Sequence, residues 1–480
     1  MSFWEQIFLS ETGDNKMSDK NGGSLRAKKS LFEIDMCSGS IVGKMLLFAV
    51  PLIFSSVLQL LFNAADVVIV GKFAGDNALA AVGSTGALIN LLVNVVMGLS
   101  VGTNVLVARH FAAKEDEEVS KAVHTSMVIS VIGGIFLTII GLIFAPKILV
   151  LMDTPAGEVR DLATLYLRIY FLGIIASVVY NFGSAVLRAI GDTVRPLIFL
   201  FISGVVNVGL NLFFVIKLGM SVDGVAIATV VSQCISATCV VVVLFTEKSS
   251  VKLELKKLRI SKDKLIQILK IGLPAGIQGS LFSLSNVALQ SSINYFGETV
   301  IAGNSAAGNL EGFVYVSMNA FHQAAISFVG QNVGAGQYKR VNKVLYSALG
   351  CVTAVGVLLG WGLFLFGEPL LGLYTTSPEV IKAGMSRLGM ISTVYFLCGI
   401  MDVFVGALRG LGKSIMPMIV SLIGACGFRL LWVATVFQIP QFKYIETVYI
   451  SYTISWIMTA ATHMICYIVT RKKLRQVWGT

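Results

Sequence analysis

Long apolar stretches, separated by short charged or Gly- and Pro-rich segments, run through most of the chain. Many of them reach or exceed the roughly 20 residues that a helix needs to cross a lipid bilayer. We therefore expect about twelve membrane-spanning helices, six in each half of the chain. The expected spans are residues 43–70, 78–108, 122–145, 162–187, 193–216, 224–246, 265–295, 300–333, 344–366, 383–408, 414–437 and 446–470.

The prolines predict that the chain consists of two copies of one unit. Eight of the nine form pairs, three of which are 223 residues apart and the fourth 221. Because proline has a fixed φ and no amide hydrogen, matching prolines mark matching bends and turns. The pairs are Pro51 with Pro274, Pro146 with Pro369, Pro155 with Pro378, and Pro196 with Pro417.

An even number of spans in each copy brings both copies into the membrane from the same side. We therefore expect an all-α integral membrane fold in which two six-helix lobes are related by a pseudo-two-fold axis along the membrane normal. Glycines four residues apart, as in Gly98-x-x-x-Gly102 and Gly272-x-x-x-Gly276, predict helix surfaces that pack closely.

Composition separates this chain from soluble proteins. Only 13% of its residues are charged, 55% are hydrophobic, and the mean hydropathy is +0.81. Soluble domains carry about 25% charged residues. The chain is therefore predicted to be a polytopic membrane protein.

Lysine and arginine are distributed unevenly between the two ends of the predicted bundle. Of the 37 basic residues, 28 lie in the tails and in the loops after spans 2, 4, 6, 8 and 10, eight lie at the opposite face, and Arg429 lies inside a span. Because basic loops stay in the cytoplasm, we expect a multi-pass membrane protein with both termini cytoplasmic. The basic segment from Lys248 to Lys270 is expected to face anionic lipid headgroups and not nucleic acid.

These boundaries divide the chain into five predicted parts. They are a cytoplasmic N-terminal tail (1–40), a first lobe (41–246), a cytoplasmic linker (247–262), a second lobe (263–470) and a basic cytoplasmic C-terminal tail (471–480). We expect a monomer whose partners include membrane lipids.

Motifs of enzymes and of ATP-driven pumps are absent from the sequence. The chain has no Walker loop, no G-x-S-x-G elbow and no nucleotide fingerprint. Its seven cysteines include no CxxC, and its four histidines are dispersed. We therefore expect no enzyme activity, no cofactor and no disulfide framework. An intramembrane transferase is the less favoured alternative, because the acidic cluster from Glu115 to Glu118 has no second acidic motif to accompany it.

Asp66 is the most informative polar residue in the first half. A charge in the middle of a membrane costs a few kcal/mol, so a charged residue at this depth indicates a functional or structural role. Asn63 and Gln59 lie three and seven residues before Asp66, which places the three side chains on one helical face. That face is predicted to point into protein or water. The alternative is that Asp66 lies at the end of its span, close to Lys72, and has only a capping role.

Three further charges lie in predicted spans of the second half: Glu311, Asp402 and Arg429. Arg429 needs a counter-charge, which Glu311 or Asp402 could provide, either as a structural ion pair or as part of a substrate or ion site. Tyr315 and His322 lie on the same helical side as Glu311. His322 is either a buried, hydrogen-bonded histidine or a proton relay.

Several motifs together resemble one family, the bacterial multidrug and toxic compound extrusion (MATE) transporters, over about residues 41–470. They are Pro51 followed fifteen residues later by Asp66, LRAIGDT at 187–193, NVGLN at 207–211, GVAIAT at 224–229, VGQN at 329–332, and LRGLG at 408–412. The resemblance implies twelve helices in two lobes around a central cavity. It also implies a cation site in the first lobe, formed by Asp66, Asn181, Asn207, Asn211 and Thr229.

The sequence departs from the family at Asn211, where many relatives carry Asp. Asp66 is then the only titratable group among the five, and either H⁺ or Na⁺ remains open as the coupling ion; no other metal is expected. In the second lobe, the expected span 265–295 places Gln278 and Asn286 on a largely neutral face. Asp402 occupies the position that Asn181 has in the first copy, so this position is polar in both lobes.

The resemblance implies a cation-coupled antiporter of the inner (cytoplasmic) membrane. Its small-molecule substrates would be organic, cationic or polyaromatic compounds, exported by alternating access. Pro51 is the expected hinge, because it leaves one carbonyl of its helix without a donor. A lipid-linked or glycolipid flippase of the same superfamily is the alternative. It is disfavoured by twelve spans and by an expected cavity with more acids than bases. A channel is disfavoured because duplicated lobes suit alternating access.

Overall fold

The computed structural model describes residues 32–152 and 154–478. The first 31 residues of the expected N-terminal tail and the last two residues of the chain lie outside the described residues. The longer helices are α2 (Ile41–Phe73), α3 (Asp76–Ala112), α4 (Asp116–Leu151), α5 (Glu158–Ala189), α6 (Val194–Leu212), α7 (Val222–Thr246), α8 (Lys262–Asn294), α9 (Glu298–Gly334), α10 (Tyr338–Leu365), α12 (Pro378–Ile391), α13 (Phe396–Gly410) and α16 (Ile445–Trp478). The shorter elements are α11 (Gly367–Gly372), α14 (Ile415–Ser421), α15 (Phe428–Ala434), the π-helical segments η1 (Phe213–Lys217) and η4 (Leu422–Gly427), and the 3₁₀ turns η2 (Leu255–Lys257), η3 (Ser392–Val394), η5 (Val436–Gln438) and η6 (Pro440–Phe442).

The prediction of an all-α membrane fold is confirmed. Among the described residues, ten helices are long and apolar enough to cross a membrane, or eleven when the bent pair α12 and α13 is taken as one span. The remaining long helix, α9, coincides with the expected span 300–333 but is not one of these. It carries polar residues such as Asn304 and Glu311 that are buried inside the protein, and this lowers its hydropathy.

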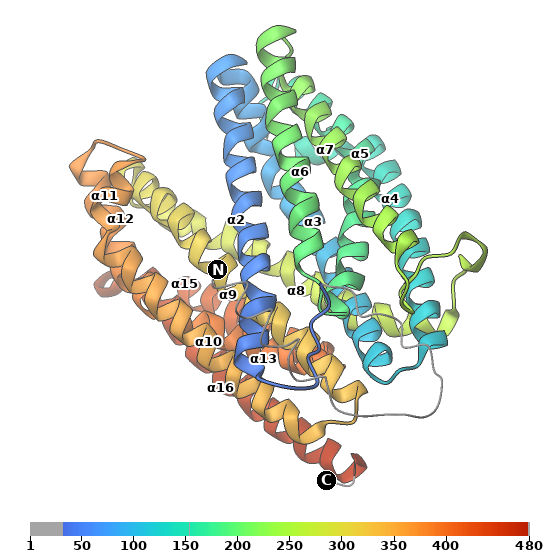
Figure 1. Ribbon diagram of the computed structural model, residues 1–480. Coiled ribbons are helices and arrows are strands. Elements are labelled where there is room, and N and C mark those ends of the chain that lie inside the picture. Colours follow the sequence, from blue (N-terminus) through green and yellow to red (C-terminus); the bar gives the residue numbers. More distant parts are fainter. Residues whose placement is uncertain (1–31, 153, 479–480) are drawn as a thin grey trace, which may run out of the picture. The chain divides into compact units, whose positions relative to one another are not determined.

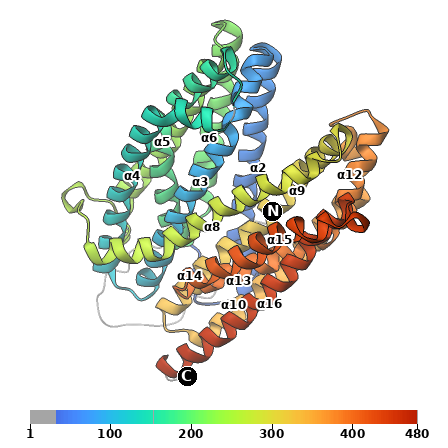
Figure 2. The ribbon, with the colours of Figure 1, turned by 180° about the vertical axis from the view of Figure 1, so that it is seen from behind.

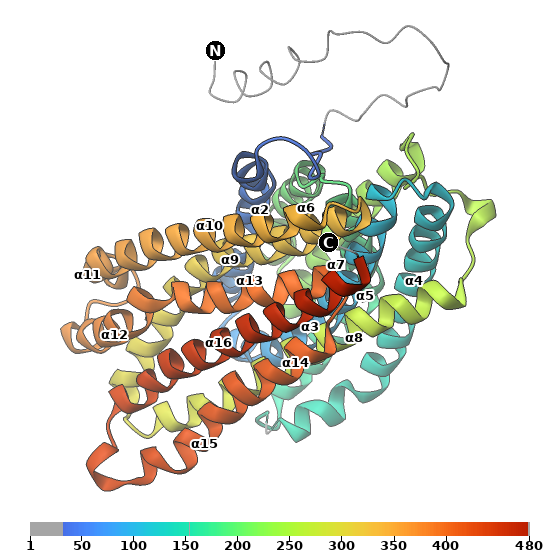
Figure 3. The same cartoon turned by 90° about the horizontal axis from the view of Figure 1, so that it is seen from below.

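The helices form two groups that follow the order of the chain. Helices α2 to α7, blue to green in Figure 1, form the N-lobe, in which α5 packs against α3, α4 and α7. Helices α9 to α16, yellow to red, form the C-lobe, and the view from behind in Figure 2 shows the same division. Within the C-lobe, α10, α13 and α16 lie side by side in that order (Figure 3).

The first helix of each copy begins in the core of the opposite lobe and ends in its own. On α2, Phe48 packs edge-on against Phe328 of α9, with 5.8 Å between the ring centroids. Further along the same helix, Ile69 lies in the core of the N-lobe. On α8, Ile268 belongs to a core formed by N-lobe helices, whereas Ile293 packs in the C-lobe. The two helices are therefore exchanged between the lobes.

The repeated prolines lie near these transitions. Pro51 and Pro274 are both buried and lie inside helices that continue without a break. Pro51 lies near the end of the part of α2 that packs on the C-lobe, which includes Leu52, and the hydroxyl of Ser55 donates a 2.8 Å hydrogen bond to the Pro51 carbonyl.

Glycines bring α3 and α8 into backbone contact across the lobes. A Cβ atom added at Gly98 would lie 2.1 Å from the backbone nitrogen of Gly276. One added at Gly102 would lie 2.2 Å from the carbonyl oxygen of Ile268. The predicted close packing at both glycine pairs is confirmed, because no larger residue fits there.

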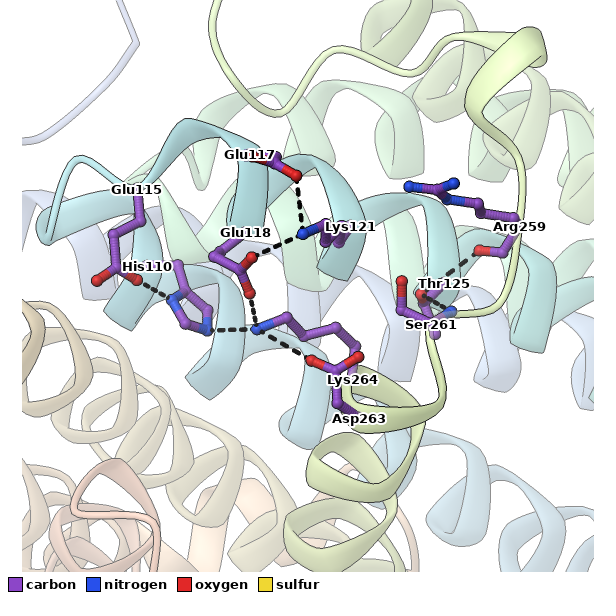
Figure 4. Close-up of polar contacts among 10 residues, drawn as sticks. All are labelled: His110, Glu115, Glu117, Glu118, Lys121, Thr125, Arg259, Ser261, Asp263 and Lys264. Atoms are coloured by element: carbon purple, nitrogen blue, oxygen red, sulfur yellow. Dashed lines mark hydrogen bonds and ion pairs between the residues drawn. The ribbon is translucent and has the colours of Figure 1, made fainter.

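A polar network ties the start of α8 to α3 and α4 (Figure 4). The side chain of Lys264 is only 3% exposed and pairs with the carboxylate of Glu118. The same ammonium donates to Nε2 of His110 at 3.1 Å and lies 3.6 Å from the carboxylate of Asp263. Lys264 is therefore a buried cation that attaches the start of α8 to two helices of the N-lobe.

The linker between α7 and α8 is attached to α4 by backbone hydrogen bonds. Nε2 of His124 accepts from the amide of Glu254 at 3.0 Å. The hydroxyl of Thr125 accepts from the amide of Ser261 at 3.0 Å and donates to the carbonyl of Arg259 at 3.5 Å. These contacts hold the linker against the N-lobe.

Candidate functional site

Asp66 lies against two asparagines of the neighbouring helix. Nδ2 of Asn211 donates to Oδ1 of Asp66 at 2.5 Å and to Oδ1 of Asn207 at 3.3 Å. Asn207 and Asn211 are one helical turn apart, so α6 presents both on the face that packs against α2. Oδ1 of Asn211 is buried and has no hydrogen-bond partner among the described residues. The cluster therefore combines one carboxylate with two amide oxygens.

The other two predicted members, Asn181 and Thr229, do not bond to Asp66 in the described part of the chain. Nδ2 of Asn181 donates to the carbonyl of Ser177 at 2.8 Å, and the Thr229 hydroxyl donates to that of Val225 at 2.9 Å. Each side chain thus donates a hydrogen bond to a carbonyl of its own helix, and its oxygen remains available as an acceptor.

Gln59 and Asn63 lie on the face of α2 that carries Asp66, but both are exposed, whereas Asp66 is half-buried. Sequence analysis missed Tyr166 of α5, which lies close enough to Asp66 to interact with it electrostatically. The ring of Tyr166 stacks on that of Tyr170, with 6.4 Å between centroids. A pair of tyrosines four residues apart in an apolar helix was the available signal.

Glu311 has an ion-pair partner that sequence analysis did not expect. Arg387 of α12 donates to its two carboxylate oxygens at 3.0 and 2.7 Å, and to Oδ1 of Asn304 at 2.5 Å. The pairing of Glu311 with Arg429 was therefore wrong. Arg387 is one of the eight basic residues assigned to the opposite face of the bundle, but it turns into the lobe and reaches the acid.

Arg429 is not paired with Asp402 either: within the described residues it has no ion pair. Its guanidinium lies 4.2 Å from the ring centroid of Tyr452 and 5.5 Å from that of Trp456, and Nε donates to the Ser455 hydroxyl at 2.8 Å. The charge is stabilised by aromatic faces instead of a carboxylate.

A cavity of about 400 Å³ in the C-lobe, extending to α3, contains most of the candidate residues of the second half. The predicted residues that line it are Gln278, Asn286, Tyr315, His322, Asp402 and Arg429. A second cavity of about 370 Å³, lined by Glu311 and Arg387, shares Asn286 with the first. Volumes of this size suit drug-sized ligands.

The charges that line the larger cavity differ from the expectation. Acids were expected to outnumber bases, but the lining contains one acid, Asp402, and two bases, Arg409 and Arg429. In the sequence, Arg409 stands out only as part of the repeated LRGLG motif. Its guanidinium turns into the cavity because the motif ends α13 inside the protein, where Arg409 is 6% exposed.

His322 connects Asp402 and Arg409. Its Nδ1 lies 2.6 Å from the backbone carbonyl of Asp402 and donates to it, so Nε2 is free to accept from Nη1 of Arg409, 3.4 Å away. Nη2 of Arg409 donates to Oε1 of Gln278 at 2.9 Å. His322 is therefore a hydrogen-bonded histidine that positions Arg409.

Two irregular helices border this cavity. α12 and α13 are bent by 44° around η3, and Tyr395 and Cys398, just after the break, line the cavity. The π-helical segment η4 ends two residues before Arg429. π-bulges and breaks of this kind are frequent at functional sites, because they redirect side chains.

Comparison with known proteins agrees with this architecture. The chain is 29% identical to a probable multidrug resistance protein, YoeA of Bacillus subtilis, over 81% of this chain and 85% of the relative. It is 26% identical to a probable multidrug resistance protein, NorM of Thermotoga maritima, over 80% of this chain and 82% of the relative. A solved structure described as the outward-facing conformation of a multidrug resistance MATE family transporter has a TM-score of 0.86, at 22% identity, and covers 92% of this chain and 98% of that one.

The MatE family model matches the chain twice, at residues 51–213 and 274–434. The two matches begin at Pro51 and Pro274, the first pair of the repeated prolines. The chain therefore belongs to the MatE family, the multidrug and toxic compound extrusion transporters.

Proposed function

We propose that this protein is an antiporter of the cytoplasmic membrane that exports organic compounds in exchange for H⁺ or Na⁺, with Asp66 as the coupling residue. The observation that carries the proposal is the contact of Asp66 with Asn211, next to Asn207. Hard cations such as Na⁺ prefer oxygen ligands, and this cluster offers one carboxylate and two amide oxygens. A proton would instead bind the carboxylate alone.

Ligation of Na⁺ by Asp66 and Asn211 together requires the side chain of Asn211 to turn, whereas a proton can bind the second carboxylate oxygen of Asp66 without that turn. In the structure its amide N–H donates to Asp66, and an N–H group can neither ligate a cation nor accept a proton. After the amide turns, the now unpartnered Oδ1 faces Asp66, where it can ligate Na⁺ or accept from a protonated carboxyl. Ion binding at Asp66 would thereby change the side-chain contacts that α6 makes with α2.

Helix α2 supplies a route from this site to the other lobe. Asp66 lies on the part of α2 that belongs to the N-lobe, and the part before Pro51 packs on the C-lobe. A change of the interactions at Asp66 would alter the contact of α2 with α6 and, through Pro51, its angle to the C-lobe. By reciprocity, the ion weakens substrate binding as much as the substrate weakens ion binding.

The sequence predicts cationic or polyaromatic substrates, both termini in the cytoplasm and a monomer. The walls of the larger cavity support the polyaromatic expectation, because Phe282, Tyr315, Tyr395, Tyr452 and Trp456 line it. Flat aromatic compounds stack favourably on such rings.

Substrate uptake into inside-out vesicles, which corresponds to efflux from the cell, is driven separately by a proton gradient and a sodium gradient to test the proposal. Asp66→Asn protein that is inserted and folded should lose efflux driven by either gradient, whereas Asp223→Asn, at the start of α7, should retain it. Undiminished efflux from folded Asp66→Asn protein would rule out Asp66 as the coupling residue.

A further inference from the structure

The larger cavity of the C-lobe has an unbalanced charge. Asp402 provides one negative charge, while Arg409 and Arg429 provide two positive charges, and no other charged residue among those that the structure describes lines it. His322 adds no charge, because its Nδ1 donates to a carbonyl and its Nε2 accepts from Arg409. The adjoining cavity is balanced, because Glu311 and Arg387 pair with each other. One positive charge is therefore left over.

Both guanidinium groups also keep hydrogen-bond donors that nothing in the described chain accepts. Nε of Arg409 and Nη2 of Arg429 are buried and without a hydrogen-bond partner. The two residues are 6% and 4% exposed, so neither donor is satisfied by bulk solvent around an exposed side chain. A buried charge without a partner is costly, and arginine recognises carboxylates particularly well because its planar group presents several donors.

The same cavity has an aromatic wall beside these donors. Tyr395 and Trp456 lie 5.3 Å apart between ring centroids, and Tyr452 and Trp456 lie 5.8 Å apart. Arg429 rests on Tyr452 and Trp456, so its guanidinium lies directly against this aromatic wall. A ligand that places a flat ring against this wall brings a substituent on that ring close to the guanidinium.

We propose that the C-lobe cavity binds a planar aromatic compound that carries a carboxylate, with the carboxylate at Arg409 and Arg429 and the ring against Tyr452 and Trp456. The ligand supplies the missing negative charge and the missing acceptors together. Asp402 opposes it, because a like charge in the same cavity repels the carboxylate. Arg429 occupies the position of Val208 in the first copy, using the 221-residue offset, so this site belongs to the C-lobe alone.

This inference names a substrate class and rests on the proposed export function for its meaning, but binding can be tested without transport. The probes are three compounds with the same ring: 9-anthracenecarboxylate, the neutral 9-anthracenemethanol and the cationic 9-anthracenemethylamine. Each is titrated into full-length protein in lipid nanodiscs, and binding is measured by the fluorescence of the ring. Acetate, added as a competitor, distinguishes a site for any carboxylate from a site for an aromatic one.

The unmodified protein should bind the acid at least about tenfold more tightly than the alcohol or the amine, because only the acid forms charged hydrogen bonds with both arginines. Millimolar acetate should not displace it. Equal affinity for the three compounds, or displacement by acetate, would overturn the proposal without any variant.

Variants test the residues. Arg429→Gln and Arg409→Gln should each weaken binding of the acid about tenfold and leave the alcohol unaffected. Asp402→Asn should tighten binding of the acid about threefold, because it removes the opposing charge. Lys443→Gln, which removes an exposed cation of the same lobe outside both cavities, is the matched control. Unchanged affinity for the acid in both arginine variants would overturn the proposal.

The two proposals fail separately. Asp66→Asn protein should bind the acid normally, since Asp66 lies in the other lobe. Loss of the acid site with intact ion-driven efflux would leave the coupling role of Asp66 standing, and the reverse result would leave the cavity assignment standing.

Discussion

Arg387 donates a hydrogen bond to each carboxylate oxygen of Glu311, at 3.0 and 2.7 Å, deep inside the C-lobe. The two side chains are 11% and 4% exposed, and the ring of Tyr449 lies 5.8 Å from the guanidinium. A parallel, bidentate arrangement of this kind satisfies most donors and acceptors of both groups. The pair therefore brings α9 and α12 together while leaving no net charge.

Glu311→Gln should destabilise the protein strongly, because it leaves the Arg387 guanidinium buried without a counter-ion. Loss of one partner of a buried pair costs about 3–5 kcal/mol. Thermal unfolding in detergent should give a clearly lower Tm for the single variant, and the double variant Glu311→Gln with Arg387→Gln should recover part of the loss. A double variant that is less stable than either single one would contradict a structural pair.

Asn211→Asp should make efflux more dependent on sodium. A second carboxylate next to Asp66 raises the negative charge of the cluster, which favours a hard cation. Vesicle efflux should then show a lower sodium concentration for half-maximal rate than in the unmodified protein. The double variant Asp66→Asn with Asn211→Asp exchanges the carboxylate and the amide between the two helices. Part of the efflux that is lost in Asp66→Asn should return in this double variant. No sodium effect in the single variant would argue against this cluster as the ion site.

Gly98→Ala should disturb the contact of α3 with α8, because the new methyl group would meet the backbone of Gly276 at 2.1 Å. Overpacking of this kind costs about 1–3 kcal/mol, and the helices must separate to relieve it. Gly133→Ala on α4 is the matched control, since a Cβ there has nothing within 4 Å. A lower Tm is expected for the first variant only. Similar Tm values for both would mean that the helices are not held this closely.

Glu118→Gln should loosen the start of α8 and the linker, because Lys264 loses its main counter-charge (Figure 4). The linker contains Lys and Arg residues, so trypsin should cleave it faster in this variant. Glu117→Gln is the control: Glu117 is 82% exposed and contacts only Lys121 within this network. Equal cleavage rates in the two variants would show that the network does not hold the linker.

Pro51→Ala should slow transport several-fold while leaving ligand binding intact, if the change of angle in α2 limits turnover. The substitution restores one backbone N–H inside the helix, where proline leaves a carbonyl without its donor. Pro146→Ala, at another proline within a helix, is the control and should transport normally. Equal rates for the two variants would remove Pro51 as a hinge.

Most of the helices could be predicted from the sequence, because a bilayer imposes a length and an apolar composition that are visible locally. The prediction of close packing at Gly98 and Gly276 was also within reach, since only residues without a side chain allow backbones to touch. The neighbourhood of Asp66 with Asn207 and Asn211 followed from the spacing of the two asparagines together with the family resemblance.

The contents of the C-lobe cavity could not be predicted in the same way. Arg387 and Arg409 lie near helix ends, and the long side chain of arginine can turn outward to water or inward to a carboxylate. Which of these occurs depends on α9, whose Glu311 and His322 are distant in sequence from both arginines. The sequence around Arg429 was therefore not enough to predict which residues contact it.

The exchange of α2 and α8 between the lobes also bears on how the chain arose and how it can be divided. A half-length chain would expose the apolar surface that Phe48 or Ile268 now buries in the other half. Two such chains would satisfy each other by trading their first helices, as domain-swapped dimers do. The present protein has the architecture of a swapped dimer fused into one polypeptide, so its two different halves should assemble when coexpressed.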